Sequence, residues 1–185
     1  MRVLGLDVSS TTIGIAVLDV DPITKKVTLT HLDHFNPPKE GHILDRLSQT
    51  RAHLTQVFQT WQPSEIAIED ILLGAGKTTT IKTLSILSIF NRVIGLAALD
   101  HLKKVPHLFN VMKIRHGLKS CKELPKKEEI PELVAKHLNI PFPYLYKKPR
   151  VAKKSKKPPP APKLDIVNYD RADAIAVALY YLKQL

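Results

Sequence analysis

The sequence contains one cysteine among its 185 residues, and its hydrophobic stretches are short. Because a single thiol cannot form an intramolecular disulfide, Cys121 favours a reducing, intracellular compartment. None of the eight histidines stands at zinc-ligand spacing with that cysteine. The first predicted strand begins at Arg2, which leaves no room for a signal peptide. Lys82, Asn91 and Arg92 interrupt the apolar stretch 81–99, so we expect no membrane span.

Carboxylates are few in the apolar parts of the chain, yet four of them lie at the ends of apolar runs. Asp7 ends one strand-like run and Glu69 ends another, whereas Asp170 and Asp173 begin an otherwise apolar helix. Their separation by three residues places the last two on one helix face. Ionised carboxylates rarely lie in apolar stretches unless a charge offsets them. A group of hard oxygen ligands suits Mg²⁺ or Mn²⁺, with phosphate supplying the remaining ligands.

The positive charge is concentrated in one part of the chain. The net charge is +11, and residues 101–163 carry 17 Lys and Arg against 4 Asp and Glu. The remainder carries 11 against 13, so a basic half faces a slightly acidic half. This division predicts a surface that binds a polyanion above an acidic, metal-binding centre. A metal-dependent nuclease needs this combination.

The order of predicted elements indicates one α/β domain over residues 1–185. Three strands connected by short turns come first and are expected to be antiparallel neighbours. The predicted strands are residues 2–8, 12–20, 27–33, 65–69 and about 107–112. The predicted helices are residues about 43–61, 78–99, 128–138 and 170–182. We expect residues between the fifth strand and residue 127 to form a basic loop. The result is a mixed five-stranded sheet flanked by helices.

Residues 141–163 differ from the rest in composition, and we expect an extended loop insertion there. Between Tyr146 and Lys163 there are eight Lys and Arg, five Pro and no acid. Proline at this density excludes a helix. Four of these basic residues, here called the loop lysines, are predicted to contact nucleic acid; they are Lys153, Lys154, Lys156 and Lys157. A solvated linker and a nuclear localisation cluster are the alternatives.

Three motifs together resemble the RuvC-type Holliday-junction resolvases of the ribonuclease H-like superfamily. They are Leu4–Asp7 with the following strand Gly14–Val17, Ile66–Glu69, and Asp170–Ala176. The first motif lacks the Asp-Pro-Gly of many bacterial members and is closer to the viral and organellar branches. The resemblance covers about residues 2–138 and 170–182. It implies a homodimer that cuts two opposed strands of a four-way DNA junction in the cytoplasm or nucleoid, with organellar and nuclear locations left open.

The resemblance also implies roles for individual residues. Asp7, Glu69, Asp170 and Asp173 would bind two divalent metal ions, and we call them the four acids. Leu72, beside Leu73, takes the place where family members often have an aromatic residue that stacks at the junction centre. Lys113 and Lys127 match DNA-contacting lysines of the family. Three nearby basic residues are expected to share that role: Arg115, Lys119 and Lys122.

Other functions are weighed against this interpretation. Residues 74–78 resemble the end of a nucleotide-binding loop, but the required Gly is replaced by Ile71, so we expect no nucleotide cofactor. Lys77 would instead contact a DNA phosphate at the start of the following helix. The actin and sugar-kinase ATPases need two domains, whereas this chain supplies one. A nuclease acting on a structured RNA precursor and a non-catalytic DNA-binding protein, with Asp170 as a helix N-cap, stay open.

Overall fold

A mixed sheet of five strands forms the centre of the protein, in the order β3-β2-β1-β4-β5. The structure is a computed structural model that describes residues 1–71, 80–119, 123–147 and 161–185. The first three strands are antiparallel, and β4 and β5 run parallel to β1. Their bounds are β1 Arg2–Val8, β2 Ile13–Val20, β3 Val27–Phe35, β4 Glu65–Asp70 and β5 His107–Asn110. The predicted fold class is confirmed.

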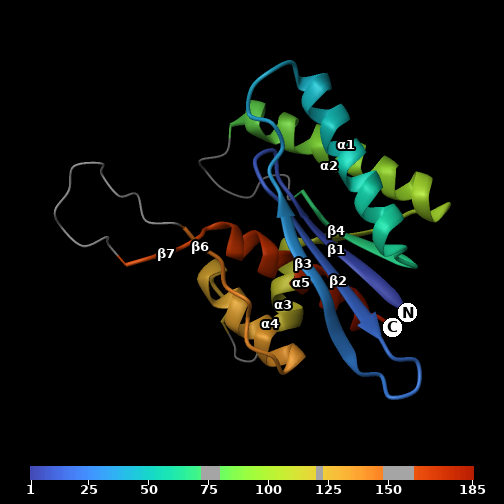
Figure 1. The fold of residues 1–185 in the computed structure, drawn as a ribbon, viewed down its shortest axis with the longest axis vertical. Helices are drawn as coiled ribbons and strands as arrows, with labels where there is room; N and C mark the ends of the chain where they lie inside the picture. Colours follow the sequence, from blue (N-terminus) through green and yellow to red (C-terminus); the bar gives the residue numbers. More distant parts are fainter. Residues whose placement is uncertain (72–79, 120–122, 148–160) are drawn as a thin grey trace.

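Helices cover both faces of the sheet, as Figure 1 shows. On one face lie α1 (Ile43–Trp61) and α2 (Ile81–Leu102). On the other lie three helices and a short 3-10 turn: α3 Val111–Leu118, η1 Lys127–Glu129, α4 Ile130–Leu138 and α5 Val167–Leu182. Alternation along the strands divides the core. Leu4 and Leu6 pack toward α1 and α2, whereas Val3 packs toward α5.

Helix α3 corrects the expectation that residues after the fifth strand form a loop. The fifth strand ends at Asn110, two residues earlier than expected, and the Asn110 side chain accepts a hydrogen bond from the Met112 amide at 2.8 Å. Asparagine is a favoured N-cap because it satisfies an unpaired helical N–H in this way. Ile114 and Leu118 are buried on the α5 side of the sheet. Ile114 and Leu118 are four residues apart, as on one face of a helix, but the basic residues around them favoured the prediction of a loop.

The start of α5 also differs from the expectation. The helix begins at Val167 rather than Asp170, so Asp170 lies within it, and the alternative in which Asp170 serves as an N-cap is excluded. Before the helix, the described residues of 141–163 make core and strand contacts, whereas an extended loop was expected. Phe142 is buried in the core, and β6 (Tyr146–Lys147) pairs with β7 (Lys163–Leu164). The buried Asn168 side chain bonds both the amide and the carbonyl of residue 145.

Helix α2 is long and apolar enough to cross a membrane, judged by length and composition only. The expectation that the hydrophobic stretches are short is therefore wrong for this helix. In the fold this helix packs against the sheet through Phe90, Ile94, Ala97 and Ala98, which are buried. Its outward side remains apolar and exposed.

Candidate active site

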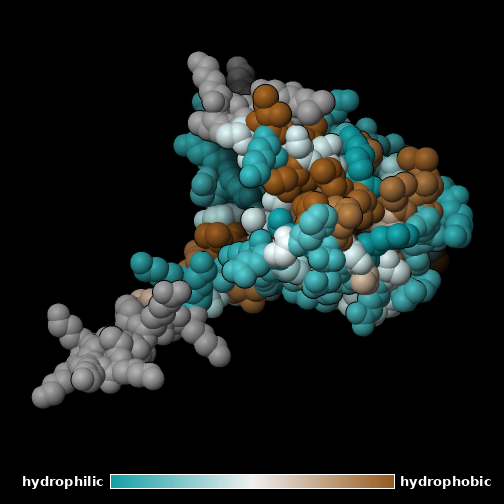
Figure 2. All heavy atoms as spheres, turned by 90° about the horizontal axis from the view of Figure 1, so that it is seen from above, coloured by the Kyte–Doolittle hydropathy of each residue, from teal (hydrophilic) through white to brown (hydrophobic). Residues whose placement is uncertain are grey.

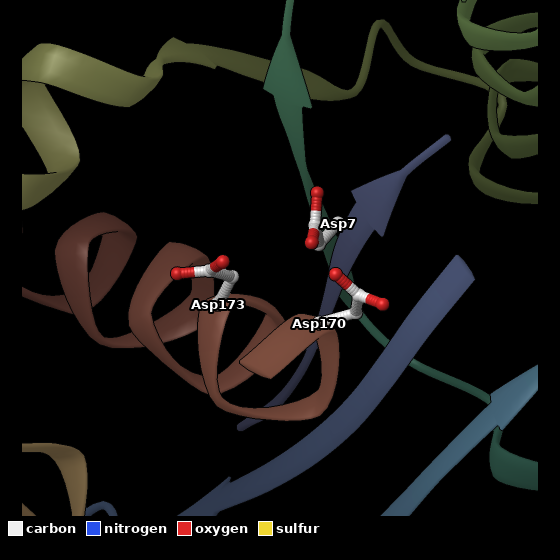
Figure 3. A group of neighbouring side chains, drawn as sticks. All are labelled: Asp7, Asp170 and Asp173. Carbon is white, nitrogen blue, oxygen red and sulfur yellow. The ribbon is translucent and has the colours of Figure 1, made fainter. Parts of the chain in front are cut away.

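Three aspartates from two distant segments of the chain meet at one end of the sheet. One ligand oxygen from each of Asp7, Asp170 and Asp173 lies within 4.8 Å of the others. Asp7 comes from the C-terminal end of β1, and the other two come from α5. Figure 3 shows Asp7 on the strand beside the helix that carries Asp170 and Asp173. We call these residues the aspartate cluster.

Two glycines allow this convergence by letting α5 lie directly on the sheet. Gly14 is the register partner of Asp7 on the neighbouring strand. A Cβ atom at Gly14 would clash with the carbonyl oxygen of Asp170, and one at Gly5 would clash with that of Ala174. Only glycine lacks this atom, so the close approach of helix and strand requires it here. The backbone contact thereby places the first turns of α5 beside Asp7.

The fourth predicted acid, Glu69, adjoins the aspartate cluster without being one of the three. It is the penultimate residue of β4 and lies, by strand alternation, on the same sheet face as Ala67, which packs toward α5. Its negative charge acts on Asp7, and the charge of Asp173 acts on Glu69 in turn. The structure therefore gathers all four predicted acids into one electrostatic site.

Burial makes the carboxyl groups of Asp7, Glu69 and Asp173 hard to ionise, and repulsion between neighbouring acids adds to this effect. Burial raises the pKa of Asp7 well above its usual value, and the charges of Glu69 and Asp173 raise it further. Burial, followed by the charge of Asp173, raises the pKa of Glu69 to about 8. Burial raises the pKa of Asp173 to about 6, against the opposing effect of nearby cations. A site of this kind becomes fully ionised at neutral pH only when positive charge is bound.

Lys127 supplies some of that positive charge from η1. Its Nζ donates a hydrogen bond to Asp170 Oδ1 at 2.8 Å and lies 3.6 Å from Asp173 Oδ2. Burial lowers the pKa of Lys127, but the bond to Asp170 and the charge of Asp173 outweigh it and hold the pKa above its usual value. The sequence predicted a DNA contact for this residue, whereas the structure places its ammonium among the acids.

Arg115 is the second cation near the acids. Its charge lowers the pKa of both Glu69 and Asp173, in opposition to their burial. Its Nε atom is buried and has no hydrogen-bond partner among the described residues. Arg115 lies on α3, which begins directly after β5, so this helix brings the side chain toward the end of β4. This guanidinium therefore offsets part of the negative charge of the acids.

The remaining predicted DNA contacts lie farther out or outside the described residues. Lys113 and Lys119 are exposed on and just after α3. Outside the described residues are Leu72, Leu73, Lys77, Lys122 and the loop lysines. Sequence reasoning missed one polar residue near the site. Asn91 is buried in α2 and donates a hydrogen bond to the Glu69 carbonyl oxygen at 2.8 Å. The sequence signal that could have identified Asn91 is its amide side chain within a largely apolar helix.

The site suits a divalent cation by the chemistry of its ligands. It offers carboxylate oxygens from two chain segments that a single cation could join, and these are the ligands preferred by Mg²⁺ and Mn²⁺. The raised pKa values of Asp7 and Glu69 show that the folded site favours added positive charge. No cysteine or histidine belongs to this group of ligands among the described residues, which disfavours zinc.

Similar proteins share both sequence and fold with this chain. A RuvC protein from Dehalococcoides mccartyi is 27% identical over 140 residues, covering 76% of this chain and 80% of that protein. One from Xanthomonas campestris is 32% identical over 85 residues, covering 44% of this chain and 46% of that protein. In the second alignment the chain spans about half the length of its relative.

Solved structures agree with the fold. The structure of Thermus thermophilus RuvC in complex with a Holliday junction substrate matches with a TM-score of 0.67 at 18% identity, covering 100% of this chain and 96% of that one. The yeast mitochondrial Holliday junction resolvase Ydc2 matches with a TM-score of 0.61 at 11% identity, covering 98% and 77%. The family described as crossover junction endodeoxyribonuclease RuvC matches residues 3–144, which is most of the chain. The chain therefore belongs to the RuvC family.

Proposed function

We propose that this protein is a structure-selective endodeoxyribonuclease that resolves four-way DNA junctions by metal-dependent phosphodiester hydrolysis. The observation that carries the proposal is the aspartate cluster, joined by Glu69, in a chain of the RuvC family. Asp7 lies near the end of β1 with Asp170 and Asp173 of α5 beside it, and Glu69 lies near the end of the neighbouring strand β4.

The four acids would hold two Mg²⁺ ions, for which Mn²⁺ would substitute. Asp7 would be the central ligand, with Glu69 on one side and the two α5 aspartates on the other. When bound, the metal ions supply Lewis acidity that activates a water molecule and stabilises the leaving 3′ oxygen. The protein contributes the geometry: glycine-mediated contact of α5 with β1 and β2 fixes the separation of the acids.

The two cations of the site have different tasks in this proposal. Lys127 pairs with Asp170 and Asp173. It would be available to a phosphate if a metal ion offset the charge of these aspartates instead. The charge of Arg115 acts on Glu69 and Asp173 and would attract a phosphate placed beside these acids. Together they would offset the charge of the substrate backbone close to the acids.

DNA binding beyond the acids would use the basic residues between 101 and 163. The β6–β7 pair, at the base of the loop, places Lys147 opposite Lys163. Like charges directly across a strand pair are destabilising unless an anion lies nearby. Asp165 offsets Lys147 weakly, at 3.9 Å. This arrangement supports phosphate contacts by both lysines and by the loop lysines, which lie between them in the chain.

A homodimer is proposed because a four-way junction has two equivalent strands to cut. Figure 2 shows hydrophobic side chains gathered over the side where α1 and α2 lie. Exposed apolar residues on α2 recur every seven or eight positions and so share one face, namely Ile81, Ile89 and Leu96. A second copy packing on this face would cover them. Sedimentation that shows a monomer at micromolar concentration, with and without junction DNA, would contradict the dimer.

The direct test incubates the protein with a synthetic four-way junction and Mg²⁺. Paired nicks in opposed strands are expected, with little cutting of linear duplex DNA or structured RNA. Asp7→Asn serves as the matched inactive control because it removes charge while nearly preserving shape. Preferential cutting of RNA would redirect the proposal to an RNA substrate, and activity that survives Asp7→Asn would remove the metal site from the mechanism.

A further inference from the structure

A buried amide in the middle of α2 touches the strand that carries Glu69. Asn91 has 1% of its surface exposed, and its Nδ2 donates to the Glu69 carbonyl oxygen at 2.8 Å. Burying a primary amide costs free energy unless its hydrogen bonds are made. Its neighbours Phe90 and Ile94 are buried and apolar, so this amide departs from the pattern of the helix.

Arg92 extends the contact to the next residue of β4. Its Nη1 donates to Asn91 Oδ1 at 3.1 Å, and its Nη2 lies 3.2 Å from Asp70 Oδ1. The Asp70 carboxylate also accepts a hydrogen bond from the Ile71 amide at 2.9 Å. One turn of α2 thus holds both Glu69 and Asp70. We call Asn91 and Arg92 the α2 clamp.

The clamp acts where the sheet no longer restrains one side of the strand. The register between β1 and β4 ends at Leu6 and Ile68, one residue before Glu69. On the other side, pairing with β5 continues through Glu69 and Asp70. The α2 clamp therefore holds the part of β4 that has lost its β1 partner. The direction of the Glu69 side chain depends on the backbone that the clamp restrains.

We propose that Asn91 is a positioning residue for Glu69, and that Arg92 holds the Asn91 amide in its orientation. The inference rests on the proposed function, because it assigns the supporting contact of a ligand in that site. Supporting contacts of this kind orient ligands, and their loss weakens metal affinity or activity by about 10–100-fold. The metal chemistry would then depend on a residue of α2 that touches neither metal nor DNA.

The test compares Asn91→Leu with Arg51→Gln in the full chain. Leucine keeps a similar volume but makes neither hydrogen bond. Arg51→Gln removes another α2 ion pair, the 2.8 Å contact between Arg51 and Asp100, which lies away from the acids. Mn²⁺ affinity is measured by calorimetry, and Mg²⁺ dependence by junction cleavage. Asn91→Leu should weaken Mn²⁺ binding and raise the half-saturating Mg²⁺ concentration by about tenfold or more, with junction affinity without metal unchanged.

Each outcome decides the inference. If folded Asn91→Leu binds Mn²⁺ as tightly as the wild type, Asn91 serves only as a hydrogen-bond donor to the Glu69 carbonyl oxygen and does not position the Glu69 side chain. An equal loss in Arg51→Gln would show a general effect on α2 and overturn the positioning role. If Asn91→Leu does not fold, Arg92→Gln replaces it, and unchanged Mn²⁺ affinity in that variant refutes the clamp. Failure of the wild-type protein to cut junctions would refute the proposed function, while the calorimetry would still test Asn91.

Discussion

Replacing Glu69 by Gln should stabilise the metal-free protein, and increasingly so as pH rises. The folded protein holds the Glu69 proton up to about pH 8, whereas an unperturbed carboxyl group releases it near 4.5. Between these values the folded state binds more protons than the unfolded state, so the free energy of unfolding falls with rising pH. The favourable contribution is complete below pH 4.5 and is lost toward pH 8. Glutamine resembles the protonated acid and removes this dependence.

The size of the effect follows from the pKa difference. One pKa unit corresponds to about 1.4 kcal/mol, so the loss for Glu69 at pH 7 is at most about 3 kcal/mol. Glu69 is partly exposed, so water screens part of the penalty. We therefore expect a gain of about 1–2 kcal/mol for Glu69→Gln at pH 7 and almost none at pH 4.5.

Urea unfolding in the presence of a metal chelator, repeated from pH 4.5 to 8.5, measures the difference in free energy of unfolding between the wild type and Glu69→Gln. Comparison of both proteins at the same pH cancels the contribution of groups that titrate alike. Added Mg²⁺ should reverse the order, because a ligand that binds only the folded wild type contributes about 2.7 kcal/mol at 100 times its dissociation constant. A variant that is less stable at pH 8 without metal, or a difference that does not grow with pH, would refute the electrostatic reasoning.

Three further predictions concern the same surfaces. Asp173→Asn should reduce junction cleavage by more than about 100-fold, beyond the loss typical of a supporting contact, while junction affinity in a gel-shift assay holds or improves. Lys127→Gln should lower the melting temperature in chelator and lose much of that deficit in Mg²⁺, since the cation then offsets the aspartates; an equal deficit in both conditions would contradict this role. Replacing the loop lysines by Ser should flatten the slope of log affinity against log salt by roughly two to four units. Duplex and junction should weaken alike, and an unchanged slope would identify a solvated linker.

The sheet and the four acids were predictable because their signals are local. Apolar runs with short turns between them define β1 to β3, and each ends where a polar residue follows. The spacing of Asp170 and Asp173 depends only on helix geometry. In contrast, α3 was hidden because its basic residues mask two buried positions, Ile114 and Leu118. Two apolar positions among basic residues are too few to predict a helix from the sequence, even with Asn110 as its N-cap.

The contacts that complete the site could not be read from the chain, because they join residues that no spacing rule connects. Lys127 meets Asp170 across 43 positions, and Asn91 meets Glu69 across 22. A lysine in a basic segment has the same local signature whether it faces solvent or an acid. Its role is set by the position of α5 on the sheet, and that position depends on Gly5 and Gly14. The glycines are thus as necessary to the site as its carboxylates, since a side chain at either one would displace the helix that carries two of them.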